Sequence, residues 1–201
     1  HLLSRRQRQM CIRDRFDAAE KAHIPVWITE ISDVTPLDTS IQDGLKWAVT
    51  FHNYLTKANV NAIIWWGGAM PTSNNESLII LNKNRKDYTL SKRYDILGNY
   101  SRYISEGSTR IQVTQPKNKD LLVSAYKKND KYILVAINLS EKTISTNIRL
   151  DGANIKGALK QFITNKDNRW NKTNIVPVSN KYYNLTIPQF SIVTLVGKVH
   201  L

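Results

Sequence analysis

Glu30 is the residue that is best placed to do chemistry. It lies near the end of residues 26–31, a short stretch of β-branched and aromatic side chains that predicts a buried strand. α/β barrels carry their catalytic groups at the carboxyl ends of such strands, and an apolar core does not favour a carboxylate there. Glu30 is therefore a candidate catalytic carboxylate. The alternative is a strand-end glutamate that meets only solvent or a lysine.

Trp65 and Trp66 end a second apolar stretch, residues 60–66, which Gly67 and Gly68 terminate. Consecutive residues of a strand face opposite ways, so we expect one indole to enter a barrel and the other to pack outward on a helix. An aromatic face at a barrel mouth is a platform for the apolar face of a sugar ring. Core packing is the alternative for either tryptophan.

Other kinds of site have no support in the sequence. The four histidines are scattered singly and Cys11 is the only cysteine, so no zinc pattern exists and no metal site is predicted. A Gly-rich phosphate loop and a nucleophile-elbow serine are also missing, and no cofactor is predicted. His52 is expected to be buried or capped rather than to act as a base.

Residues 16–107 alternate between helix and strand, as βα units do. A strand that is apolar on both faces, such as residues 60–66, is typical of a parallel sheet covered by helices. The predicted order is a helix end at residues 16–22, a strand at 26–31, a helix, a strand at 60–66, a long loop at 71–89, and a second helix. The capping-box spacing of Thr39 and Gln42 predicts the start of the first of these two helices. Ser91 is the predicted cap of the second, and Gly107 its predicted stop.

From residue 109 the pattern changes to short alternating stretches, with a hairpin turn at Asn129 and Asp130. Their spacing predicts an antiparallel β-sandwich over residues 108–201, and no helix. The predicted strands are residues 110–114, 121–127, 131–139, 143–150, 158–163, 182–187 and 191–196.

The composition fits a globular protein, with 41% hydrophobic and 22% charged residues. The first fifteen residues differ from the rest: they hold five arginines, one aspartate and Cys11. They resemble translated sequencing-adapter DNA, so we predict that residues 1–15 are a non-native arm. A basic arm that binds nucleic acid is the alternative reading of this segment.

The formal net charge is +13, but the basic residues are spread one or two at a time among apolar ones, as on a solvated surface. We therefore predict no nucleic-acid partner. The longest uncharged apolar run, residues 60–70, is too short to cross a bilayer, and no transmembrane helix is predicted.

Several of these segments together resemble the C-terminal part of a family 30 glycoside hydrolase. The resemblance rests on PVWITE at 25–30, VNAIIWW at 60–66, SKRY at 91–94, GNYSRYI at 98–104 and RI at 110–111, in that order and at matching spacing. Members of this family have a (β/α)8 barrel fused to a side β-domain. They include endo-xylanases, glucuronoxylanases, β-1,6-glucanases and glucosylceramidases.

The resemblance implies that residues 16–107 hold the last two strand–helix units of the barrel. Glu30 then matches the nucleophile at the end of the seventh strand, and Trp65 or Trp66 matches an aromatic residue that lines the sugar site. The family's general acid/base is a glutamate on the fourth strand and has no counterpart here. A retaining enzyme needs two carboxyls about 5–5.5 Å apart, so we expect this chain to be inactive alone and prone to aggregate.

Glucuronoxylan-specific relatives carry a basic residue just beyond the eighth-strand tryptophans, where this chain has Gly67 and Gly68. This difference argues against a dependence on glucuronate. Lys83, Arg85 and Lys86 in the following loop are possible substitutes, although such loops are more often plain surface.

The sequence therefore predicts part of a secreted, retaining hydrolase of β-linked polysaccharide, with xylan as the favoured substrate and a monomer as the full-length form. A β-1,6-glucanase or a glucosylceramidase-like β-glucosidase is the alternative within this class. The β-rich half could instead be a non-catalytic carbohydrate-binding module. That reading requires an exposed row of aromatic residues, whereas we expect the candidates to lie mostly in the core; they are Tyr132, Trp170, Tyr182 and Tyr183.

Overall fold

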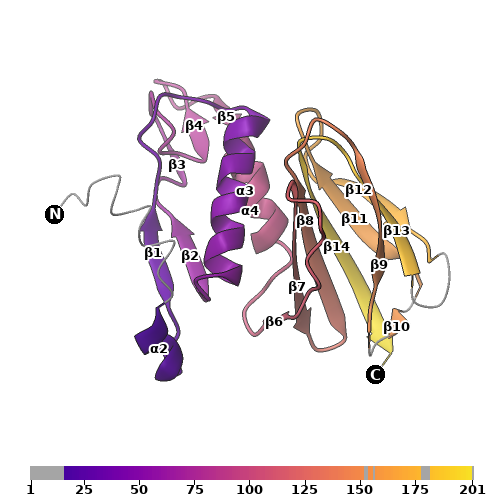
Figure 1. The fold of residues 1–201 in the computed structure, drawn as a ribbon. Coiled ribbons are helices and arrows are strands. Elements are labelled where there is room, and N and C mark those ends of the chain that lie inside the picture. The colour runs from indigo at the N-terminus through magenta and orange to yellow at the C-terminus, as the bar shows by residue number, and fades with distance from the viewer. Residues whose placement is uncertain (1–15, 152–153, 156, 178–181, 201) are drawn as a thin grey trace. The chain divides into compact units, whose positions relative to one another are not determined.

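The computed structural model describes residues 16–151, 154–155, 157–177 and 182–200 (Figure 1). The predicted non-native arm, residues 1–15, lies outside these described residues. The described chain forms two compact units. One contains the described residues up to Thr39 together with Val49–Ser91, and the other contains Ser40–Ala48 together with the described residues from Lys92 onward.

The first unit is built around a pair of parallel strands. Helix α2 (Asp17–Lys21) precedes β1 (Trp27–Ile31), and β1 pairs in parallel with β2 (Ala62–Trp65), as the sequence predicted. The second half of α3 (Ile41–Thr56) belongs to this unit and covers one face of the pair. The core on that face consists of Tyr54, Ala58 and Val60, packed against Phe16, Val26, Ile28, Ile31 and Ile63.

The segment predicted as a loop, residues 71–89, contains most of a small sheet instead. Its strands are β3 (Ala69–Met70), β4 (Ile79–Leu81) and β5 (Tyr88–Leu90), with β3 and β4 parallel and β4 and β5 antiparallel. Strands of two or three residues are too short to give a period-two pattern, so the sequence could not reveal them.

The second unit begins with the first half of α3, which starts one residue later than its predicted cap. The hydroxyl of Ser40, rather than Thr39, accepts a hydrogen bond from the backbone N–H of Asp43 at 3.4 Å. The carboxylate of Asp43 forms a buried ion pair with Arg93 of α4 (Lys92–Ser101). A Cβ at Gly44 would lie 3.0 Å from the Cβ of Lys92, so the two helices approach closely there.

Most of the second unit is antiparallel sheet. The larger sheet has the order β12-β11-β14-β8-β7-β6, with β10 paired to β14, and a second sheet pairs β13 with β9. The strands are β6 (Thr109–Ile111), β7 (Leu121–Lys128), β8 (Lys131–Asn138), β9 (Ile144–Arg149), β10 (Asn154–Ile155), β11 (Leu159–Thr164), β12 (Asn171–Ile175), β13 (Tyr182–Ile187) and β14 (Ser191–His200).

The two sheets share one apolar core. It contains buried residues of the larger sheet and of β13, with partly buried side chains of β9 packed against it. The buried members are Leu121, Ala136, Leu159, Tyr183, Leu185, Ile187, Val193 and Leu195. The sequence predicted seven of these nine strands and missed β10 and β12. Strand β10 has only two residues, and four of the five residues of β12 are exposed and polar.

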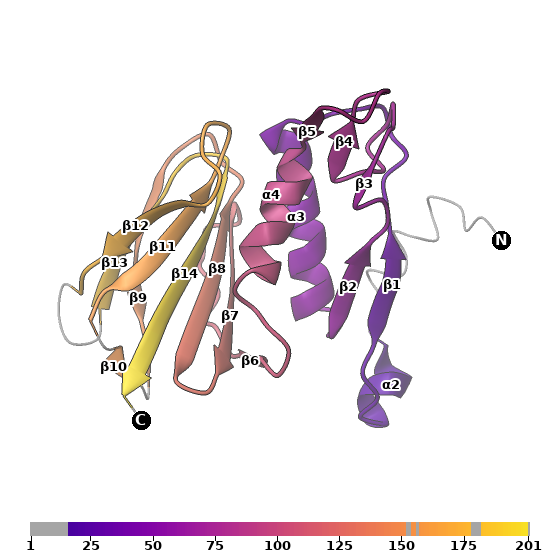
Figure 2. The same cartoon turned by 180° about the vertical axis from the view of Figure 1, so that it is seen from behind.

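Helix α4 belongs to the second unit because it packs on the larger sheet, against β11 and β14 (Figure 1 and Figure 2). Asn99 of α4 donates to Thr194 Oγ1 at 3.1 Å and accepts from Thr164 Oγ1 at 2.6 Å. Trp170 lies so close to the helix that a Cβ at Gly98 would be 2.2 Å from its ring. The sequence-based division near residue 107 assigned this helix to the barrel unit instead.

Candidate active site

Glu30 lies in β1 at a break in the strand register. Ile28 pairs with Ile63 but Ile31 pairs with Trp65, so Thr29 and Glu30 together oppose the single residue Ile64. Simple alternation from Ile28 would point Glu30 towards α3. Because β1 has one residue more than β2 at this point, the alternation shifts by one position. Ile31 therefore lies in the core under α3, and Glu30 is exposed on the other face.

The two tryptophans at the end of β2 have different environments, as the sequence predicted. Trp65 is 8% exposed, contacts Phe51 of α3 edge-on at 6.4 Å between ring centroids, and donates its indole N–H to Glu76 O at 2.8 Å. Trp66 is 52% exposed. Because Ile31 and Trp65 are register partners, Glu30 and Trp66 both point to the face of the pair that α3 does not cover.

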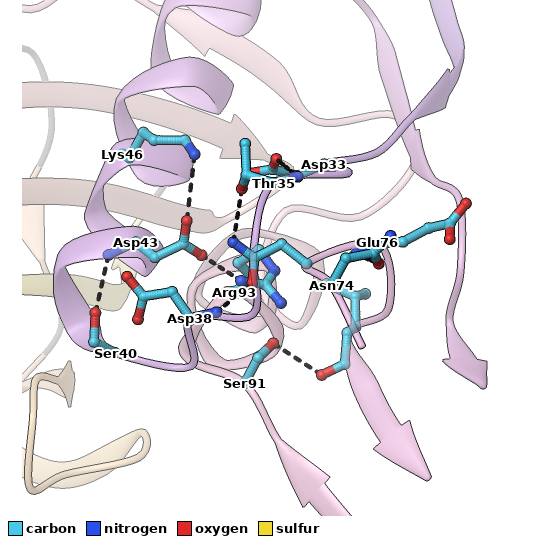
Figure 3. A network of polar contacts seen from close by, with 12 residues as sticks. Asp33, Thr35, Asp38, Ser40, Asp43, Lys46, Asn74, Glu76, Ser91 and Arg93 are labelled. Atoms are coloured by element: carbon cyan, nitrogen blue, oxygen red, sulfur yellow. Dashed lines mark hydrogen bonds and ion pairs between the residues drawn. The ribbon is translucent and has the colours of Figure 1, made fainter. Parts of the chain in front are cut away.

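The loops that follow the two strands are joined by Asn75, which is 1% exposed. Figure 3 labels Thr35 and Asp38 of the first loop and Asn74 and Glu76 of the second, which flank Asn75 in sequence. Its backbone N–H donates to Thr35 O at 3.0 Å, and its side-chain Nδ2 donates to Thr35 Oγ1 at 3.0 Å. Its Oδ1 accepts from the backbone N–H of Asp38 at 2.7 Å, and Asp33 Oδ1 accepts from Thr35 N at 2.9 Å. Sequence reasoning missed Asn75, since nothing in its local pattern distinguishes it from an ordinary loop asparagine.

The turn after Trp66 requires one glycine and leaves space at the other. Gly67 has a φ of +83°, and a Cβ there would lie 2.5 Å from Glu76 O. A Cβ at Gly68 would meet nothing within 4 Å. The three basic residues considered as substitutes, Lys83, Arg85 and Lys86, lie exposed between β4 and β5.

The aromatic residues of the second unit do not form an exposed row. Tyr183 is buried in the core, and Trp170 packs against Tyr94 and carries Arg102 over its ring at 4.2 Å. Tyr132 is half-buried with Lys127 over its ring, and Tyr182 alone of the four is exposed. The surface that a carbohydrate-binding module would need is therefore not formed by these residues.

His52 is buried in α3, as expected. Within the described ranges, no three His, Cys, Asp or Glu side chains are grouped so that they could hold a metal ion. None of the helices that the structure describes has the length and apolar character needed to cross a membrane.

The chain is similar in sequence to a known enzyme, although no protein-family model matches it. It is 26% identical over 180 residues to glucuronoxylanase XynC of Bacillus subtilis strain 168. This match covers 85% of the chain and 39% of the relative, so the chain spans about two-fifths of that relative's length.

The fold is similar to that of solved glycoside hydrolases. A family 30 subfamily 8 xylanase, Xyn30A from Clostridium acetobutylicum, matches with a TM-score of 0.78 and 22% identity over 92% of this chain and 45% of that one. The endo-β1,6-glucanase BT3312 matches with a TM-score of 0.62 and 15% identity over 94% of this chain and 38% of that one. The sequence match and the fold match together confirm the resemblance to a family 30 xylanase that the sequence motifs indicated.

Proposed function

We propose that this chain supplies the nucleophile of a retaining glycoside hydrolase that acts on xylan, and that Glu30 is this nucleophile. The observation that carries the proposal is the exposure of Glu30 at the carboxyl end of β1, on the same strand face as the exposed Trp66. The similarity to a glucuronoxylanase supports xylan as the substrate class.

The reaction would be a double displacement. A carboxylate oxygen of Glu30 attacks the anomeric carbon of the sugar, and the bond from that carbon to the leaving oxygen breaks. A second carboxylic acid protonates the leaving oxygen. The same group then removes a proton from water, which attacks the anomeric carbon, releases Glu30 and gives a product of retained configuration.

Trp66 would hold the sugar while this happens, because an exposed indole offers a flat apolar face to a pyranose ring. Trp65 would support it indirectly through its packing on Phe51 and its hydrogen bond to Glu76. No metal or cofactor takes part in these steps, since both displacements need only carboxyl groups and water.

The remaining parts of the active site would come from a longer polypeptide, since the chain spans 39% of its curated relative. Two parallel strands cannot close a barrel, so β1 and β2 would be the last two strands of a (β/α)8 barrel. The acid/base carboxyl would lie on another strand. The full-length protein would be a secreted monomer, as expected of an enzyme whose substrate is a cell-wall polysaccharide.

Glucuronate side groups would not be required. Family 30 enzymes that depend on glucuronate carry a basic residue in the turn after the eighth-strand tryptophans, whereas this turn holds Gly67 and Gly68. Gly67 has no room for a side chain, and Gly68 leaves the available space empty. We therefore expect hydrolysis of unsubstituted xylan.

The test is an assay of the longer protein on unsubstituted xylan, glucuronoxylan and β-1,6-glucan. Xylan hydrolysis that Glu30→Gln lowers by about a thousandfold or more, with β-configured first products by NMR, supports the proposal. Glu20→Gln in the exposed part of α2 is the matched control and should leave the rate unchanged. First products of inverted configuration would rule out the mechanism, and activity on β-1,6-glucan alone would rule out the substrate.

A further inference from the structure

We infer that Asn75 is a positioning residue for the nucleophile, acting through Thr35; this inference rests on the proposed function of Glu30. The end of β1 needs such support because its register is irregular at Glu30. The strand pairing ends with the Ile31–Trp65 pair and the hydrogen bond from Trp66 N to Ile31 O, 2.8 Å long. Further along the chain, Asn74 and Asn75 hold the two following segments together through their contacts with residues 35–38.

Asn75 is itself fixed to the end of β2. The adjacent Glu76 accepts the indole N–H of Trp65 on its carbonyl at 2.8 Å, and Leu78 N donates to Gly67 O at 2.9 Å. Gly67 allows this approach, since any side chain there would collide with Glu76 O. The buried side chain of Asn75 therefore ties the segment after Glu30 to residues 75–78, which also contact the residues on either side of Trp66.

The side-chain contacts of the buried Asn75 are specific in geometry. Its Nδ2 donates to Thr35 Oγ1 and its Oδ1 accepts from the backbone N–H of Asp38, so a shift of either loop breaks a hydrogen bond of this buried amide. A displacement of about 1 Å at a reacting group can cost a hundredfold in rate. Loss of the Thr35 hydroxyl should therefore slow the attack by Glu30 more than it weakens substrate binding.

The experiment measures kcat and KM of the longer protein on 4-nitrophenyl β-xylobioside. Thr35→Val keeps the side-chain shape but removes the oxygen that accepts from Asn75 Nδ2, and we expect kcat to fall about tenfold or more with KM within about twofold. Thr35→Ser keeps the hydroxyl and should restore most of kcat. Thr72→Val is the matched control: it removes a hydroxyl that contacts Asn74 in the same loop, and it should leave kcat nearly unchanged.

A second pair of variants serves if Thr35→Val does not fold. Asn75→Asp still accepts from Asp38 and can accept from the Thr35 hydroxyl, so its kcat should exceed that of Asn75→Ala. Equal kcat values for Thr35→Val and Thr35→Ser would overturn the inference and leave the proposed function standing. Where Thr35→Val does not fold, equal kcat values for Asn75→Asp and Asn75→Ala would do the same. An inactive unsubstituted protein would overturn the proposed function, and the inference with it.

Discussion

At the scale of single residues, two neighbours in the sequence, Trp65 and Trp66, have opposite environments. Strand alternation turns one indole into the packing beneath α3 and leaves the other on the open face with Glu30. Their environments differ enough for mutation to separate stability from binding.

Replacing each tryptophan by alanine should affect a different property. Trp65→Ala removes a buried ring and its hydrogen bond to Glu76, and should lower the free energy of unfolding by about 3–5 kcal/mol. Trp66→Ala should leave that free energy nearly unchanged and raise KM for xylan. Urea unfolding and steady-state kinetics of the longer protein measure the two effects. A large loss of stability from Trp66→Ala would contradict the assignment of Trp66 to the exposed face of the strand pair.

The sequence marked Glu30 and the tryptophan pair as candidates because their residue types stand out at strand ends. Asn75 could not be marked in the same way. Its inferred role depends on Thr35, 40 residues away, and on a buried position that no periodic pattern marks. The register irregularity that exposes Glu30 was also hidden, since it arises from the pairing of β1 with β2 rather than from either strand alone.

At the scale of elements, periodicity predicted the parallel pair, both long helices and seven strands of the β-rich region. It missed β12, whose edge position allows polar residues at four of its five positions, and it missed β3 to β5 and β10, which have only two or three residues each. The predicted division near residue 107 separates α4 from the sheet that it contacts. The contacts that fix this helix, between Asn99, Thr164 and Thr194, join positions up to 95 residues apart.

Asp95 of α4 is a titratable residue that contacts Arg169 and Trp170, which lie between β11 and β12 of the larger sheet. Its buried carboxylate lies 2.6 Å from Arg169 Nε and 3.4 Å from Lys92 Nζ, and its backbone oxygen accepts the indole N–H of Trp170 at 2.8 Å. Burial raises the pKa of the Asp95 carboxyl above its ordinary value of 3.8, against the opposing effect of the two cations.

Protonation of Asp95 should therefore stabilise the folded chain. The folded pKa lies above the unfolded one, so this contribution is complete below about pH 3.8 and is lost as the pH rises through the raised pKa. Asp95→Asn should abolish this part of the pH dependence. Urea unfolding of both proteins at low concentration between about pH 3 and 7 measures it. A stability difference that does not change over this range would contradict the pKa direction.

At the scale of the whole molecule, the chain spans 39% of its curated relative and exposes one face of a two-stranded parallel sheet. That face carries large apolar side chains, with Trp27 61%, Ile64 48% and Trp66 52% exposed. Such a surface favours association in water.

We therefore expect the 201-residue chain alone to self-associate and to lack glycanase activity. Light scattering at increasing protein concentration and a reducing-sugar assay on xylan test these two points. Trp27→Ser and Ile64→Ser together should reduce the association because they remove apolar area from the open face. A monodisperse chain would contradict the expected self-association. Full activity of the chain alone would contradict the proposal that the acid/base lies elsewhere.

The most direct test of the central claim is to trap the covalent intermediate. The longer protein would be incubated with 2-deoxy-2-fluoro-β-xylobiosyl fluoride, digested, and mapped by mass spectrometry. We expect one fluoroxylobiosyl group per protein, attached to the peptide that contains Glu30 and absent from Glu30→Gln. A label on another carboxyl, in a protein that hydrolyses xylan, would contradict it.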